Sequence, residues 1–207
     1  MKNYDELSSL ELDTLKEVGS IGTGNAATSL SALIGKPVRI QQPEVRIMGY
    51  NEAIEWIGGP EEITAGVLVG MSGQLSGIML SVQQLEFVNL VLESMMGQTI
   101  SDYSVLDEMR GSALTEVGNI MISTFINALS SLAGLEIDLT VPAFTVDMQG
   151  AIMAVPMAEY GGQSDYIMTI GGNFICNGKE IPCRLLLSPD IRSLNFLLRK
   201  LGVNSGK

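Results

Sequence analysis

The sequence predicts an α/β (α+β) fold in which two pseudo-symmetric helix–strands–helix repeats share a mainly antiparallel sheet. Glu-Val-Gly, followed by a small polar residue and Ile, occurs at residues 17–21 and again ninety-nine residues later at 116–120. Each copy lies in a long helical pattern that ends at a glycine. The β-rich segments that follow have no helix between them, which favours antiparallel pairing.

The repeat extends well beyond the tripeptide. A shift of ninety-nine residues aligns 10–46 with 109–145 without a gap, in apolar positions and in turn residues alike. Chance rarely matches both kinds of position at once. We therefore expect one domain over residues 1–207, with a first repeat at about 6–97 and a second at about 104–202.

Each predicted element has a local reason. The two long helices, about 6–34 and 104–133, end at Gly35 and Gly134, because glycine readily adopts the left-handed conformation of a helix C-terminus. Shorter helices are expected at 83–97 and 189–202, and the polar segment 97–104 joins the halves. Strands are expected where β-branched and apolar residues run between turn residues. These segments are 36–50, a hairpin over 64–82, 136–148, 150–157, 165–175 and 181–188.

Composition limits the possible partners and compartment. Hydrophobic residues make up 46% of the chain and charged residues 17%, as in a globular protein. The formal net charge of −11 disfavours nucleic acids and anionic membrane surfaces. The first thirteen residues contain no apolar signal region, and no apolar run reaches the roughly 20 residues that span a bilayer. We expect a cytoplasmic protein without membrane insertion.

Cysteine and histidine usage excludes several kinds of catalytic site. Cys176 and Cys183 flank Asn177-Gly178, a strong two-residue hairpin signal, which places Cys176 opposite Lys179 and Cys183 opposite Gly172. The two sulfurs are then too far apart to bridge, so free and partly buried thiols are expected. With no histidine in the chain, Ser-His and Cys-His catalysis and His-ligated metals are excluded.

Each long helix carries a polar face in the same register. At 100° per residue, Asp13, Glu17 and Ser20 fall within an arc of about 60°. The second helix repeats this arrangement with Ser112, Glu116 and Asn119. The core is expected on the opposite faces: Leu7, Leu15, Val18, Gly22, Ala26 and Leu33 on the first helix, and Leu114, Val117, Met121, Phe125 and Leu132 on the second. The polar faces are either solvated surface or two copies of one site.

Three glycines in the first helix need an explanation. Gly19, Gly22 and Gly24 each cost roughly 1 kcal/mol relative to alanine in a helix interior. Close helix–helix approach, or backbone that a large partner can reach, would offset that cost. The order G-x-x-G-x-G differs from the dinucleotide fingerprint, no strand precedes it, and the Lys-Ser/Thr of a P-loop is missing.

The spacing of the second copy resembles a known signature. Ser112-x3-Glu116-x2-Asn119-x22-Pro142 has the form D/S-x3-E-x2-N-x22-P of the CheC/CheX/FliY phosphatases of chemotaxis. The first copy, Asp13-x3-Glu17-x2-Ser20-x22-Pro43, departs from it only at Ser20. The resemblance covers nearly the whole chain, and two copies in about 200 residues are similar to the CheC branch of the family.

The resemblance implies hydrolysis of the aspartyl phosphate of phospho-CheY. It implies that Glu116 pairs with the active-site lysine of the regulator and that Asn119 orients the attacking water. Ser112 and Pro142 would be structural members of the motif, and Asp13 and Pro43 their counterparts. The regulator would supply the Mg²⁺, so no cofactor of the chain's own is expected. Because a serine hydroxyl is shorter than a carboxamide, we expect the Glu17/Ser20 site to be weakened or to bind only.

Two alternatives of other classes remain open. Residues 144–153 resemble the region of CheC-like proteins that contacts the receptor deamidase CheD, which makes Asp147 a candidate partner contact. A non-catalytic adaptor would bind CheD and leave phospho-CheY unchanged, whereas Asp147 is otherwise a strand-edge or turn carboxylate. A flagellar-switch component related to FliY or FliM is the third interpretation.

Overall fold

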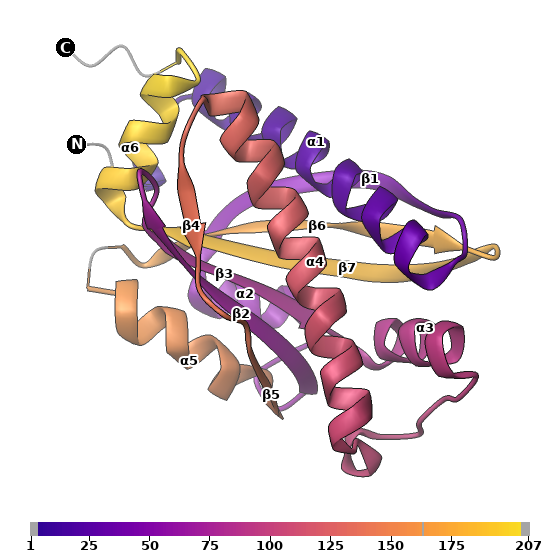
Figure 1. Cartoon of the computed structure of the whole chain (residues 1–207). Coiled ribbons are helices and arrows are strands. Elements are labelled where there is room, and N and C mark those ends of the chain that lie inside the picture. The colour runs from indigo at the N-terminus through magenta and orange to yellow at the C-terminus, as the bar shows by residue number, and fades with distance from the viewer. Residues whose placement is uncertain (1–3, 163, 204–207) are drawn as a thin grey trace.

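Strands from both repeats form one seven-stranded antiparallel sheet in the computed structural model, which describes residues 4–162 and 164–203 (Figure 1). The strand order is β1-β6-β7-β3-β2-β4, and β5 also pairs with β2. The strands are β1 (Val38–Gly49), β2 (Ile63–Gly73), β3 (Gly77–Gln83), β4 (Ile137–Leu139), β5 (Ala143–Met148), β6 (Tyr166–Cys176) and β7 (Lys179–Pro189). The repeats thus share one continuous sheet, as predicted.

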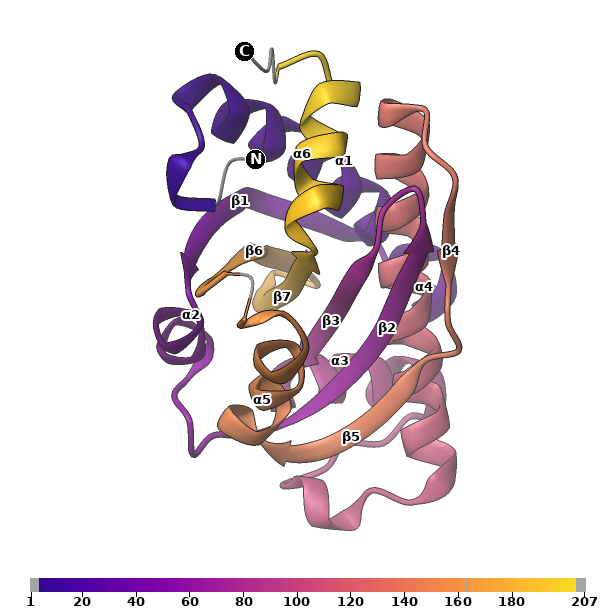
Figure 2. The same cartoon turned by 90° about the vertical axis from the view of Figure 1, so that its left-hand side faces the viewer.

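The helices form a layer on each face of this sheet (Figures 1 and 2). The long helices α1 (Ser9–Ile34) and α4 (Glu108–Ala133) pack together on one face and run in broadly opposite directions (Figure 1). The helices α2 (Tyr50–Ile57) and α5 (Gln149–Tyr160) lie on the other face. The shorter helices α3 (Leu85–Met96) and α6 (Ile191–Lys200) lie near opposite ends of the α1–α4 pair.

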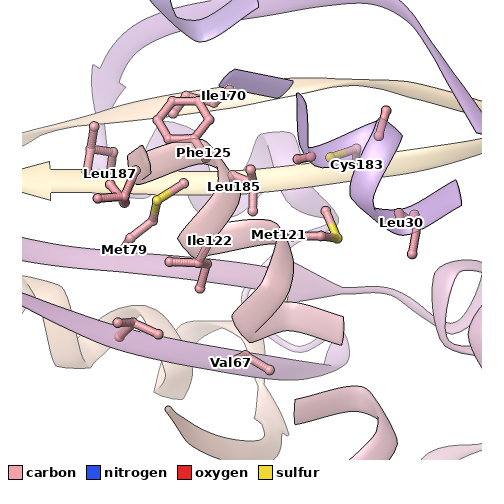
Figure 3. Close-up of a cluster of buried hydrophobic side chains, with 14 of the residues drawn as sticks. Leu30, Val67, Met79, Met121, Ile122, Phe125, Ile170, Cys183, Leu185 and Leu187 are labelled. Carbon is pink, nitrogen blue, oxygen red and sulfur yellow. The ribbon is translucent and has the colours of Figure 1, made fainter. Parts of the chain in front are cut away.

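Most of the core lies between the sheet and the α1–α4 pair (Figure 3). Met121, Ile122 and Phe125 of α4 pack there against strand residues such as Val67 and Leu185. A smaller cluster beneath α2 and α5 contains Tyr50, Ala53, Ile54, Ile152 and Met153, among others. The larger core holds the outward faces of α1 and α4 at fixed orientations, because both helices are anchored on their inner sides.

Both long helices end where predicted but begin later. Gly35 and Gly134 are left-handed, with φ of 64° and 61°. The expected starts, 6 and 104, were too early, because short 3-10 turns at Tyr4–Glu6 and Tyr103–Val105 precede the helices. The N-caps are Ser8, in a capping box with Glu11, and Asp107, which accepts from the backbone of Arg110.

The two 3-10 turns extend the repeat toward the N-terminus. Tyr4 and Tyr103 are ninety-nine residues apart, and each hydroxyl donates to a backbone carbonyl at the end of a strand from the other repeat. The acceptors are Pro189 at 3.0 Å and Gln83 at 2.9 Å. Each long helix is therefore preceded by a tyrosine anchor, which lies before the aligned segments 10–46 and 109–145.

Two predictions on the second face of the sheet were wrong. The segment 150–157 was expected to be a strand, but it lies in α5, with Pro156 inside the helix. Helix α2 was not expected, although Tyr50, Ala53, Ile54 and Ile57 are buried at helical spacing. Both segments are helical because the face of the sheet opposite α1 and α4 needs an apolar cover, which Ile152 and Met153 supply in α5. The other predicted strands and both shorter helices are present.

The cysteine prediction is confirmed. Cys176 pairs with Lys179 across the β6–β7 turn, and Cys183 pairs with Gly172. Both thiols are free and buried. Burial raises the pKa of Cys183 to about 12, which suits a packing role.

The glycines of the long helices divide into two groups. A Cβ on Gly19 would collide with Val45 of β1, and one on Gly22 would collide with Phe125 of α4. These glycines therefore permit close approach, whereas Gly24 has open space in front of its Cα. One core assignment was wrong: Leu132 is exposed, because the last turn of α4 buries Leu129 and Ala133 instead.

Within the described residues, no helix combines the length and apolarity that a bilayer crossing requires.

Candidate functional site

The polar residues of the second motif lie together on the outward face of α4. Ser112 and Glu116 are exposed, and Asn119 is half-buried. Glu116 and Asn119 are three residues apart, so they occupy successive turns of one helix face. The segment between α3 and α4 leaves this face open, since Ile100 is buried and hydrogen-bonded at both backbone groups to Asn89 of α3.

The amide of Asn119 is oriented by a neighbour one turn further on. The Ser123 hydroxyl lies 3.5 Å from Asn119 Oδ1 and can donate to it. Across residues 4–162 and 164–203 the amide nitrogen of Asn119 has no hydrogen-bond partner, and it is not enclosed. An accessible amide nitrogen without a partner in the protein can donate its N–H groups to a water or a phosphate oxygen and so orient it.

A buried glutamine supports this part of α4 from the sheet. The side-chain N–H of Gln83, at the end of β3, donates a hydrogen bond to the backbone carbonyl of Leu114 at 3.0 Å. The backbone carbonyl of Gln83 accepts a hydrogen bond from the Tyr103 hydroxyl, and burial raises the pKa of Tyr103 well above its usual range. Gly118 makes room for the glutamine, because a Cβ there would lie 2.8 Å from Gln83 Nε2. The helix backbone directly behind Glu116 is therefore fixed.

The first motif has the same placement but different chemistry. Asp13, Glu17 and Ser20 are all exposed on the outward face of α1. Asp13 pairs with Lys16 at 3.0 Å, and both side chains are largely exposed, so the pair contributes little to stability. The repeat equivalent of Lys16 is Thr115, so only the first copy places a cation beside its glutamate.

A second difference lies one turn beyond the polar residue. Ser20 takes the place of Asn119, and Gly24 takes the place of Ser123. The first copy thus lacks both the amide and the hydroxyl that orients it. Lys16, Ser123 and Gln83 were not identified from the sequence, although the ninety-nine-residue shift would have shown the first two as differences between the copies.

The two prolines of the motif occupy equivalent breaks at opposite edges of the sheet. Pro43 lies in β1, where pairing with β6 shifts register between Gln41 and Glu44. Pro142 lies between β4 and β5, which pair with successive parts of β2. Proline lacks a backbone donor, so it fits an edge strand at a bulge or break.

Asp147 is exposed on β5, where it pairs with Thr64 of β2. One of its oxygens accepts from the backbone of Met148 at 2.7 Å. Met148 is itself exposed. The carboxylate is thus a strand-edge group beside an exposed apolar residue.

The two sites lie toward different ends of the helix pair. Close contacts between α1 and α4 occur at Gly22 with Phe125 and at Ser29 with Thr124, whose hydroxyls are 3.1 Å apart. The midpoints of α1 and α4 fall at residues 21–22 and 120–121, so Glu17 and Glu116 each lie before the midpoint of their helix, by about 7 Å along its axis. Because α1 and α4 run in broadly opposite directions (Figure 1), the two exposed glutamates lie toward different ends of the helix pair.

In the described residues, no three His, Cys, Asp or Glu side chains gather in a way that could hold a metal ion.

Comparison with known proteins identifies both repeats. The model of the CheC-like family matches residues 10–47 and 109–146, which include the two motifs. The CheY-P phosphatase CheC of Bacillus subtilis (strain 168) is 24% identical over 208 residues, covering 99% of this chain and all of that protein.

Solved structures share the fold. The crystal structure of Thermotoga maritima FliY has a TM-score of 0.71 at 22% identity, covering 95% of this chain and 98% of that one. A chain in the CheX–CheY–BeF3–Mg²⁺ complex of Borrelia burgdorferi has a TM-score of 0.53 at 17% identity, covering 86% and 99%. At this level of identity the two structures establish the fold, and function has to be inferred from the site.

Proposed function

We propose that this chain, both of whose repeats match the model of the CheC-like family, hydrolyses the aspartyl phosphate of a phosphorylated CheY-type response regulator. The observation that carries this proposal is the Glu116/Asn119 pair on one face of α4, where Glu116 is exposed and the half-buried Asn119 keeps an accessible amide nitrogen without a hydrogen-bond partner in the described residues. The full-length relative named as a CheY-P phosphatase supports the same activity.

In this proposal the chain's residues act by positioning. Glu116 pairs with the active-site lysine of the regulator, and Asn119 holds a water in line with the phosphorus–oxygen bond that breaks. The Mg²⁺ belongs to the regulator, where it and the lysine neutralise the phosphoryl group. Little covalent work is then left, because phosphoryl transfer depends mainly on orientation and charge stabilisation.

The same reasoning makes the two sites unequal. We assign most of the activity to Glu116/Asn119, because Glu17 directly follows Lys16 in the sequence and has only a serine one turn further on. Lys16 would repel the regulator's lysine, and the Ser20 hydroxyl is too short to replace a carboxamide. Ser112 and Pro142, with Asp13 and Pro43, act as structural members of their motifs.

The test is the decay rate of a phosphorylated CheY-type receiver in excess Mg²⁺. Asn119→Ala should lower the accelerated rate by about 10²–10³-fold, as expected for one preorganised donor, down to what the first site supplies. Ser20→Ala is the matched control and should change the rate by less than twofold. Equal losses from Glu116→Ala and Glu17→Ala would contradict the assigned asymmetry, and no acceleration by folded wild-type protein would contradict the activity.

A second candidate function, binding of the deamidase CheD, is favoured by the exposed edge at β5. Asp147 and Met148 are both exposed there, and β5 pairs with β2 along one side. A strand edge with an acidic and an apolar side chain can bind a partner by adding to the sheet. If purified CheD binds the wild type but binds Asp147→Ala equally well, this surface is not the contact.

A further inference from the structure

Each site helix carries one exposed apolar side chain near its N-terminus. Leu10 of α1 is 62% exposed and Met109 of α4 is 71% exposed. They are ninety-nine residues apart, so they occupy the same position in the two repeats. Single exposed apolar residues are common on protein surfaces, but these two recur at one place in both copies.

The positions next to this apolar residue carry different types of side chain in the two repeats. Around the apolar residue, Ser9 corresponds to Glu108, Glu11 to Arg110, and Leu12 to Gly111. Anchoring of the helix start does not explain the apolar pair either. The residues that pack this end of each helix on the core are the preceding leucines, Leu7 and Leu106.

The apolar residue shares a face with the motif. Met109, Ser112, Glu116 and Asn119 have the spacing i, i+3, i+7 and i+10, which falls within an arc of about 80° on a helix. Met109 lies about 10 Å before Glu116 and about 15 Å before Asn119 along the helix axis. A receiver domain of about 100 residues has a radius of gyration near 13 Å. A receiver seated on Glu116 and Asn119 therefore extends over Met109.

We propose that Met109 is an apolar docking contact for the phosphorylated receiver, and that Leu10 is its counterpart at the weaker site. This inference rests on the proposed function and adds a residue that determines affinity rather than chemistry. Val105, in the 3-10 turn that precedes α4, is also exposed and adds a second apolar side chain at the start of the helix. The first repeat has Glu6 at that position, so the apolar surface is larger where Asn119 is present.

The experiment measures receiver dephosphorylation and binding with Met109→Ser, Met109→Leu and Leu10→Ser. Val155→Ser is the matched control, because Val155 is also exposed but lies in α5 on the opposite face of the sheet. Binding is measured separately with unphosphorylated receiver activated by beryllofluoride and Mg²⁺. Loss of one central apolar contact should raise KM and Kd about fivefold to tenfold and leave kcat within twofold.

Leucine at 109 should restore KM to within twofold of the wild type, because it replaces methionine at similar volume. Leu10→Ser should have a smaller effect than Met109→Ser. Unchanged KM and Kd in Met109→Ser, with an active wild type, would overturn this inference and leave the proposed function standing. A fall in kcat at constant KM would overturn it as well.

Two other results separate the remaining possibilities. If folded wild-type protein neither speeds dephosphorylation nor binds the activated receiver, the proposed function fails and the docking role fails with it. If Met109→Ser converts a dimer into a monomer by light scattering and leaves KM unchanged, the apolar residue contacts a second copy of this chain, which also overturns the inference.

Discussion

Gly118 offers a direct test of whether close packing beneath α4 fixes the site. A Cβ added there would lie 2.6 Å and 2.7 Å from two carbons of Val67. Contacts between carbon atoms are optimal at about 3.5–4.0 Å, so the overlap is roughly 1 Å. Val67 cannot move aside easily, because its strand pairs with β3 on one side and β5 on the other. The helix must therefore lift from the sheet in Gly118→Ala.

The expected magnitude follows from two opposing terms. Overpacking of a core costs typically about 1–3 kcal/mol, and alanine returns roughly 1 kcal/mol of helix propensity. With two overlaps against a fixed strand, we expect a net loss of about 2 kcal/mol in the free energy of unfolding. For a chain of this size that corresponds to a fall in Tm of about 4–8 °C.

Gly24→Ala is the control, because nothing lies within 4 Å of the added methyl group. It should gain up to about 1 kcal/mol and raise Tm by about 2–4 °C. Both variants are measured by thermal unfolding and by receiver dephosphorylation. Gly118→Ala should also lose activity, since lifting the helix moves Glu116 and Asn119. A Gly118→Ala protein as stable as Gly24→Ala would refute the packing explanation.

Three further predictions concern orientation, anchoring and alkaline stability. The first prediction uses an Asn119→Ala background, in which activity depends on the first site. There, Ser20→Asn together with Gly24→Ser should raise the activity more than Ser20→Asn alone, because Gly24→Ser supplies the hydroxyl that orients the new amide. Equal rates of the two variants would show that this hydroxyl is unimportant. Tyr103→Phe removes a hydrogen bond and should lower stability by about 1 kcal/mol in urea unfolding, and no change in the unfolding midpoint would contradict the anchor. The raised pKa of Cys183 means that its thiol stays protonated in the folded protein while the unfolded chain ionises above about pH 9. The contribution of Cys183 to the free energy of unfolding is therefore complete below pH 9 and is lost as the pH rises toward 12. The loss of stability measured between pH 9 and 11 should accordingly be smaller in Cys183→Ala than in the wild type.

The parts of the fold that the sequence predicted are those with local signals. Gly35 and Gly134 mark helix ends, and Asn177-Gly178 marks a hairpin, because these backbone conformations favour few other residues. Helix α5 was missed because Pro156 and its apolar neighbours also fit a short strand. Its helical form is imposed by the sheet face that it covers. The ninety-nine-residue shift places the start of α2, Tyr50, opposite the start of α5, Gln149, so comparing the repeats further would have indicated equivalent elements.

The outward faces of the site were also predictable, because helical periodicity alone separates Glu17 from Val18. The supporting contacts were not. Gln83 reaches α4 from a strand that ends thirty-one residues before Leu114, the residue it contacts. No spacing rule connects a buried glutamine with a helix carbonyl so far along the chain. The orienting Ser123 was within reach of sequence reasoning, since it lies one helical turn after Asn119.

The recurring Glu-Val-Gly joins the site to the core within three residues. In each copy the glutamate is exposed, the valine is buried, and the glycine faces a strand that leaves no room for a Cβ. Turning either helix by one residue, about 100°, would bury the charged glutamate and press a side chain into the strand. The strands therefore fix the rotation of α1 and α4 about their axes. A site that acts by positioning one water needs its side chains held to within about 0.5 Å, and the tripeptide supplies that constraint at the residue next to the glutamate itself.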